Sequence, residues 1–193
     1  MMGIIKTEKK EEQMKELLVV IDMQNDFLSG SLGTDEARSI VPNVCEKIEN
    51  WKGDVVMTRD THTDGYLSTA EGKMLPVPHC IQGSEGWQIN TDIWNAYTKI
   101  SGAGSGRLSA VVNKCTFGSI VLSNIAGDMN YDRVILCGVC TDICVISNAM
   151  LLRASLPEAE IIVDAACCAG VSPESHKLAL DAMAPCNIKI ING

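Results

Sequence analysis

The stretch ELLVVID, residues 16–22, is apolar at almost every position and ends in a carboxylate. A strand buried on both faces has this pattern, because neither set of alternating side chains meets water. Further β-branched apolar runs follow at residues 53–60, 108–114, 131–139, 159–166 and 187–191. Such runs are typical of parallel strands whose sheet is covered by helices on both sides.

Helical patterns lie between these runs. Four apolar residues share one helical face after the first run: Ile40, Val44, Ile48 and Trp51. We predict a second helix over residues 142–155, capped by Thr141 and stopped by Pro157, and a third over residues 172–183, which opens with serine and proline. This alternation predicts an α/β fold with three α/β/α layers and a doubly wound, mostly parallel six-stranded sheet.

Residues 61–107 form a long segment without a strand or helix pattern of their own. Segments of this length inside a compact domain are usually functional or disordered. This one holds two of the three histidines of the chain and the turn PVPHC. We therefore interpret it as functional.

Composition limits the class of protein. The length of 193 residues and 46% hydrophobic content favour a single domain over residues 16–193, preceded by a charged extension at residues 1–15. The net charge of -8 argues against nucleic-acid and membrane partners. No apolar run approaches the roughly 18 residues that span a bilayer, and no signal-peptide pattern opens the chain. We expect a cytoplasmic protein in which most of the nine cysteines are buried thiols.

Polar residues collect where the first four runs end. Asp22, Asp60 and Lys114 end the first three, and a short loop leads from the fourth to Cys144. Each alone is explained by loop hydrogen bonds, a solvated surface or a buried thiol. Because ligands bind at the carboxyl ends of parallel strands, the four together favour a functional site.

The stretch GVCTDICV, residues 138–145, separates the cysteines by role. Cys137 ends an apolar run and should be buried, whereas Cys140 lies in a turn where its backbone N–H matters more than its sulfur. Cys144 falls in the first turn of the predicted helix, where the positive helix end and a nearby Lys114 should lower its pKa. A redox pair of Cys137 and Cys140 is disfavoured because redox motifs open helices, and a zinc knuckle lacks a second pair.

A second group of polar residues is Asp60, His62, Glu71 and His79. On an extended stretch Asp60 and His62 share one face. Imidazole and carboxylate ligands suit zinc, iron or manganese. Spacing alone supports a metal site and loop hydrogen bonding equally. His176 lies on an ordinary helix face and should not affect metal binding.

Five motifs in order show a resemblance from about residue 16 to the C-terminus: VIDMQNDF (20–27), RDTH (59–62), PVPHCIQGSEGW (76–87), VNKCTFGS (112–119) and GVCTDICV. The chain resembles the isochorismatase-like cysteine hydrolases, and among them the nicotinamidases. The resemblance implies a catalytic triad of Asp22, Lys114 and Cys144. It also implies a cis peptide between Val139 and Cys140, which turns the N–H groups of Cys140 and Cys144 into an oxyanion hole.

The same resemblance implies one divalent metal ion, zinc before iron or manganese, bound by Asp60, His62 and His79 with Glu71 as fourth ligand. Because no triad residue is a ligand, we expect thiolate formation to be independent of the metal. Nicotinamidases usually place an aromatic ring ahead of the metal-binding turn. The stretch KMLPVPH offers Leu75 there instead, and we expect Phe27 and Val139 to complete the substrate pocket.

The function implied is an amidohydrolase that converts nicotinamide to nicotinate and ammonia through a cysteine thioester. The substrate partner is a small amide, and we expect a homo-oligomer. The alternatives are a cysteine amidohydrolase of ureido or carbamoyl compounds, an isochorismatase, and a non-catalytic binding protein on the same fold. The intact metal set argues against the first and the intact triad against the last, while isochorismate hydrolysis needs no cysteine nucleophile.

Overall fold

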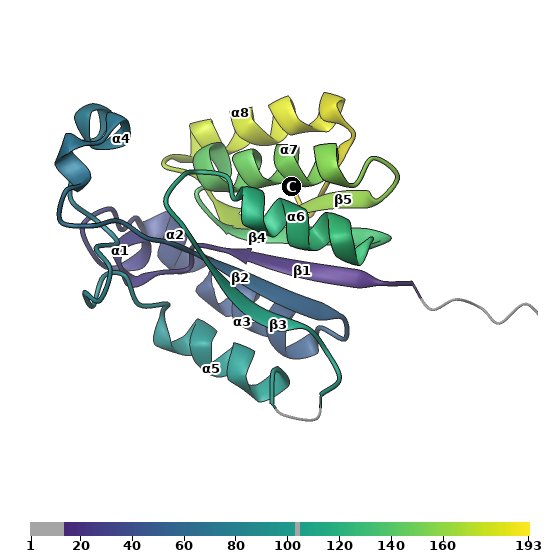
Figure 1. Cartoon of the computed structure of the whole chain (residues 1–193). Helices are drawn as coiled ribbons and strands as arrows, with labels where there is room; N and C mark the ends of the chain where they lie inside the picture. The colour runs from purple at the N-terminus through teal and green to yellow at the C-terminus, as the bar shows by residue number, and fades with distance from the viewer. Residues whose placement is uncertain (1–13, 103–104) are drawn as a thin grey trace, which may run out of the picture.

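Six parallel strands form one sheet in the order β3-β2-β1-β4-β5-β6 in the computed structural model, which describes residues 14–102 and 105–193 (Figure 1). The strands are β1 Glu16–Ile21, β2 Asp54–Asp60, β3 Ser109–Lys114, β4 Arg133–Val139, β5 Glu160–Ala169 and β6 Ile188–Ile191. Each overlaps a predicted run, so the doubly wound sheet is confirmed. The predicted extension lies mostly outside the described residues.

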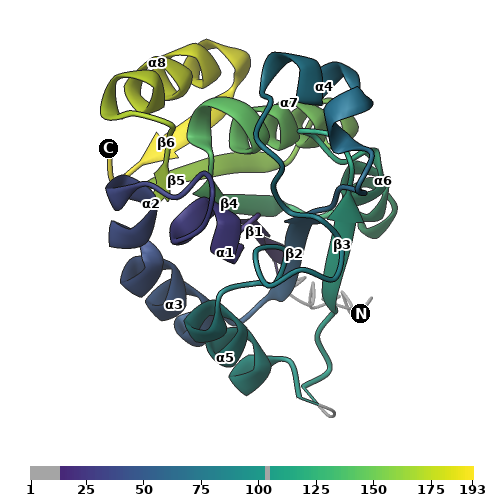
Figure 2. The ribbon, with the colours of Figure 1, turned by 90° about the vertical axis from the view of Figure 1, so that its left-hand side faces the viewer.

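Helices cover both faces of the sheet. They are α1 Asn25–Leu28, α2 Asp35–Ser39, α3 Val41–Asn50, α4 Ala70–Met74, α5 Thr91–Ile100, α6 Ile120–Met129, α7 Ile146–Ser155 and α8 Pro173–Met183, with shorter turns η1 Tyr66–Ser68, η2 Thr141–Val145 and η3 Ala184–Cys186. Helices α3 and α5 lie on one face and α6, α7 and α8 on the other, which confirms the three layers (Figures 1 and 2). None of the helices in the described ranges is long and apolar enough to cross a membrane.

The central strand β1 explains why the sheet is buried on both sides. It pairs with β2 on one edge and β4 on the other, and Leu17 to Ile21 are all buried.

Gly138 of β4 lies opposite Ile21, at a φ of 116°. A Cβ atom at this position would lie 2.1 Å from the carbonyl oxygen of Ile21, so only glycine fits.

Two predicted helices follow the sequence patterns closely. Val44 and Ile48 of α3 are fully buried, as their spacing predicts. Helix α8 begins with Ser172 as N-cap in a capping box with Ser175, which confirms the serine–proline start. All nine cysteines are free thiols and five of them are buried.

Two other predictions were correct only in part. Residues 61–107 contain the regular helix α5, whose Ile93, Ala96 and Tyr97 are buried and which packs against α3. The helix predicted over residues 142–155 is present as η2 and α7, which ends at Ser155, but its first turn is π-helical and Thr141 does not cap it. Its side chain instead contacts His176 of α8.

Candidate active site

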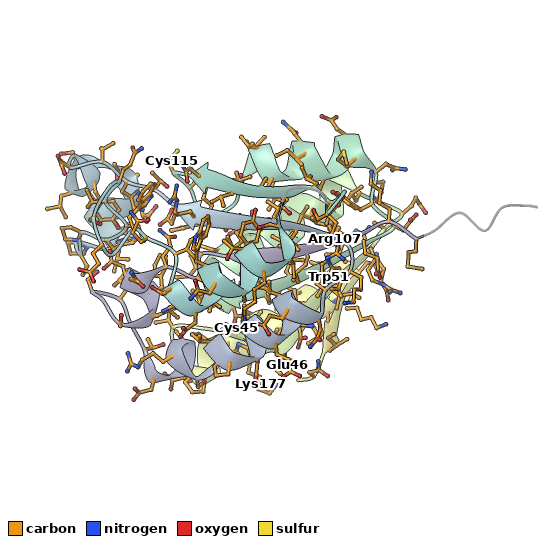
Figure 3. The ribbon with its side chains drawn as sticks, turned by 90° about the horizontal axis from the view of Figure 1, so that it is seen from below. Cys45, Glu46, Trp51, Arg107, Cys115 and Lys177 are labelled. Carbon is orange, nitrogen blue, oxygen red and sulfur yellow. The ribbon has the colours of Figure 1, made fainter. Side chains whose placement is uncertain are left out.

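The carboxyl ends of the strands bring the predicted site residues together, at the edge of the sheet that faces the viewer in Figure 2. Asp22 directly follows β1, Asp60 and Lys114 end β2 and β3, and Cys144 lies in η2 after β4. All four side chains are buried. Cys115, the residue after Lys114, is by contrast exposed and lies toward the same end of the sheet (Figure 3).

Lys114 is the centre of the first cluster. Its Nζ lies 2.6 Å from Asp22 Oδ2 and 3.5 Å from Cys144 Sγ. Asp22 has a φ of 49°, and the Thr58 hydroxyl donates to its Oδ1 at 2.7 Å. Within the described residues, no hydrogen-bond donor is assigned to Asp22 Oδ2. Its burial is compensated by the ion pair with Lys114. A carboxylate, an ammonium and a thiol thus meet in a buried site.

Burial decides the protonation of this cluster. It raises the pKa of Asp22, and the positive charge of Lys114 offsets only part of that rise. Burial also raises the pKa of Cys144 well above its usual range, Asp22 adds to the rise, and Lys114 opposes it. The predicted lowering of the Cys144 pKa is therefore wrong, because desolvation of the thiolate outweighs the nearby cation. The structure holds a neutral thiol beside its prospective base.

The turn after β4 presents backbone donors beside the thiol. The peptide bond between Val139 and Cys140 is cis, as the resemblance implies. The carbonyl of Cys140 accepts from the N–H groups of Ile143 and Val145, at 3.1 and 3.0 Å. No acceptor for the Cys140 N–H itself is found among the described residues. Cys137, by contrast, is fully buried in the core below this turn.

The second cluster consists of Asp60, His62, Glu71 and His79, whose potential ligand atoms all lie within 4.8 Å of one another. Asp60 Oδ2 is 3.0 Å from His62 Nε2 and 3.6 Å from His79 Nε2. Glu71 Oε1 is 3.5 and 3.8 Å from the same two nitrogens. Ligand atoms about 3.3–3.6 Å apart are what a tetrahedral zinc ion requires. The donors therefore fit a divalent ion of this kind.

Local hydrogen bonds hold the two imidazoles in place. The backbone of His62 pairs with the segment after His79, since its N–H donates to Cys80 O at 2.9 Å. The Nδ1–H of His79 donates to Val77 O at 2.8 Å, which leaves Nε2 free to bind a metal. The Tyr66 ring lies 4.5 and 4.9 Å from the two imidazole rings.

Gln24 is a buried residue of the site that the sequence reasoning missed. Its side chain is fully buried, donates to Asp60 O at 2.8 Å and accepts from Asp60 N at 2.7 Å. It therefore fixes the backbone of Asp60. Its place in VIDMQNDF, between Asp22 and Phe27, was the available indication.

Asp60 joins the two clusters. Its Oδ2 faces the imidazoles, while its Oδ1 lies 3.3 Å from Lys114 Nζ. The expected independence of the triad from the metal set is therefore not supported, because one carboxylate contacts both.

A cavity of about 180 Å³ opens between the clusters, with Glu71, His79 and Cys144 among its lining residues. Its apolar wall includes Phe27 and Leu75, as expected, but also Leu32, Phe117, Ile143 and Val171. Val139 is fully buried and is not part of the lining. Phe117 was missed, although it follows Lys114 in VNKCTFGS. Phe27 and Phe117 thus supply the aromatic surface that the stretch before the metal turn lacks.

Comparisons with known proteins identify relatives of this sequence and fold. The model of the Isochorismatase domain matches residues 16–193. The uncharacterized isochorismatase family protein PncA of Bacillus subtilis (strain 168) is 30% identical over 175 residues, covering 86% of this chain and 93% of that protein. The pyrazinamidase/nicotinamidase of Streptococcus mutans UA159 superposes with a TM-score of 0.79 at 25% identity, over 92% of this chain and 100% of that chain. The pyrazinamidase of Pyrococcus horikoshii in complex with zinc has a TM-score of 0.73 at 27% identity, over 93% and 99% of the two chains. The chain belongs to the isochorismatase family.

Proposed function

We propose that this chain, an isochorismatase-family hydrolase acting on amide carbon–nitrogen bonds, converts nicotinamide to nicotinate and ammonia. The observation that carries the proposal is the contact of Lys114 with both clusters around one apolar cavity. The thiol of Cys144 and the ligand residues Glu71 and His79 then face the same bound molecule, and the base Asp22 is buried beside Lys114. Similarity to a pyrazinamidase/nicotinamidase supports the same substrate class.

Cys144 is the nucleophile in this proposal and Asp22 its base. Asp22 accepts the thiol proton as Sγ bonds to the amide carbon and the carbonyl electron pair moves onto oxygen. Collapse of this intermediate breaks the carbon–nitrogen bond, and Asp22 returns the proton to the departing ammonia. Asp22 then deprotonates a water that attacks the thioester, which releases nicotinate and restores the thiol. The raised pKa of Asp22 suits it to both steps.

The backbone N–H groups of Cys140 and Cys144 stabilise the developing oxyanion. Loss of one such donor typically costs about 3 kcal/mol of transition-state stabilisation. Lys114 remains a cation throughout, because attraction by Asp22, Cys144 and Asp60 outweighs the effect of burial and raises its pKa. Its charge stabilises the thiolate while the carbon–sulfur bond forms.

Asp60, His62, Glu71 and His79 hold one divalent ion in this proposal, with zinc favoured by the donor set and iron or manganese as alternatives. When bound, the ion supplies a positive template for the ring nitrogen or for a water. Phe27 lies at the edge of His79, with 5.6 Å between ring centres, so it can flank a ring held there.

The test is ammonia release from nicotinamide, benzamide and a ureido compound, measured with metal-loaded and metal-stripped protein. Benzamide has the same ring shape and amide but no ring nitrogen. We expect a strong preference for nicotinamide in the loaded protein, and a smaller one after stripping, as the ratio of kcat/KM values. Equal preference in both states would refute the template role. If only the ureido compound is hydrolysed, ureido compounds replace nicotinamide as the proposed substrate. If none of the three compounds releases ammonia, the assignment as an amide hydrolase is refuted.

A further inference from the structure

The turn that carries Cys140 and Cys144 contains another buried polar side chain, that of Thr141. Thr141 is fully buried, and its hydroxyl oxygen lies 2.8 Å from Nδ1 of His176. Across the described ranges, no second partner for this hydroxyl is found. A single contact therefore satisfies the hydroxyl and links the turn to α8.

The start of α8 holds His176 in a fixed position. The Ser172 hydroxyl accepts from the backbone N–H of Ser175 at 3.1 Å, which closes the capping box. The N–H of His176 donates to Ser172 O at 2.9 Å. Gly170 approaches so closely that a Cβ there would lie 2.8 Å from His176 N. These contacts fix the backbone of His176 at the start of α8, and the position of the imidazole follows from it.

A second contact joins the same two segments. The N–H of Val171 donates to Asp142 Oδ1 at 3.1 Å, and the Val171 side chain lines the cavity. Asp142 is also the charged neighbour of His176. Burial lowers the pKa of His176, and Asp142 offsets only part of that effect. The ring is therefore neutral near pH 7, so its Nδ1 can accept the hydroxyl proton of Thr141.

We propose that His176 is a positioning residue for hydrolysis, which holds the turn bearing the Cys140 and Cys144 donors in place through Thr141. This inference rests on the proposed function. An oxyanion hole works only when its donors are fixed before the reaction, so movement of the turn lowers kcat. His176 itself belongs to neither the metal cluster nor the cavity lining, although Ile143 of the turn that it holds does line the cavity, so the loss should fall mainly on kcat.

Three substitutions at one position test the contact. His176→Ala removes the nitrogen, whereas His176→Asn keeps a polar atom near the place of Nδ1 and His176→Gln moves it outward. We expect the Ala and Gln variants to lose about tenfold in kcat at nearly constant KM and metal content. The Asn variant should retain most of the activity. The matched control is Lys177→Ala on the same helix, whose side chain is 75% exposed and which should behave like wild type (Figure 3).

Backbone hydrogen exchange of the peptide spanning residues 140–145, followed by mass spectrometry, tests the same contact without substrate. Exchange should be faster in His176→Ala than in wild type and slower again in His176→Asn. Wild-type protein that releases no ammonia would refute the proposed function, while the exchange result would still decide the link to the turn. Unchanged exchange and kcat in His176→Ala would overturn the inference. An Asn variant as impaired as the Ala variant would also overturn it, because a polar atom near the place of Nδ1 would then not restore the turn.

Discussion

Replacement of Lys114 by methionine tests how the buried charges are balanced. Met keeps the length of the side chain but removes the ammonium that lies 2.6 Å from Asp22 and 3.3 Å from Asp60. The Lys114 side chain is 1% exposed and that of Asp22 0%, so water cannot replace the lost cation. Removal of one partner from a buried ion pair costs about 3–5 kcal/mol. For a chain of this size that lowers Tm by roughly 6–20 °C.

The pH dependence identifies the cause of this loss. Burial already raises the pKa of Asp22, and the variant raises it further because Lys114 no longer opposes burial. The folded variant then holds a proton that the unfolded chain has released above about pH 4. Its stability therefore falls as pH rises through the folded pKa. The deficit relative to wild type should be largest near pH 8 and shrink toward pH 5, as measured by urea unfolding at each pH.

Lys47→Met is the matched control. Lys47 Nζ lies 2.6 Å from Asp164 Oδ2 in a depression of about 470 Å³ whose lining includes none of the proposed catalytic or metal-binding residues. Asn192 still donates to Asp164 Oδ1 at 3.0 Å, so we expect a smaller loss of about 1–3 kcal/mol with ammonia release retained. A Lys114→Met protein as stable as wild type at pH 8 would refute the reasoning. So would a Lys47→Met protein equally impaired in turnover.

Three further outcomes follow from the site and the sheet. Cys144→Ala should abolish ammonia release with little change in Tm, and full activity in this variant would refute the assignment of Cys144 as the nucleophile. In wild type, iodoacetamide should label the exposed Cys115 before the buried Cys144. His79→Ala should lose the divalent ion that we propose for wild type, as measured by elemental analysis, while remaining folded by circular dichroism. Retained metal would exclude His79 as a ligand. Gly138→Ala should destabilise the fold by more than about 3 kcal/mol in urea unfolding, because a Cβ at 2.1 Å from a backbone oxygen forces β1 and β4 apart, and a normal unfolding midpoint would contradict this geometry.

The strands could be predicted from sequence because the central ones are apolar on both faces. Strand β1 can be predicted without knowing its neighbours, because Leu17 to Ile21 are all apolar and leave no face for solvent. Helix α5 was missed although Ile93, Ala96 and Tyr97 carry the helical spacing of a buried face. Its short apolar stripe lies among loop residues and becomes meaningful only where it packs against α3.

The cavity wall was harder to predict, for a physical reason. Leu32, Phe117 and Val171 come from loops far apart in sequence, and none belongs to a periodic pattern. Only the parallel sheet, which gathers the loops after its strands at one edge, brings them together. Charged and metal-ligating residues could be recognised from sequence as a group, because several of them follow strand ends or fall close together in one segment. The apolar residues of the cavity wall show no sequence pattern that distinguishes them from other apolar residues.

The protonation of Cys144 shows where local sequence reasoning fails most clearly. A helix start and a neighbouring lysine predict a stabilised thiolate, and both features are near the sulfur. Desolvation nevertheless dominates, since Cys144 is 5% exposed and Asp22 repels a second negative charge. A permanent thiolate here would add a third anion to the Asp22 and Asp60 carboxylates that already face the single Lys114 cation in a buried site. In the proposed mechanism the neutral thiol avoids this cost until the amide carbon is attacked, when negative charge passes to an oxygen that the backbone N–H groups would hold. The buried ion pair of Asp22 and Lys114 therefore suits a proton transfer coupled to attack, and not a nucleophile that is ionised in advance.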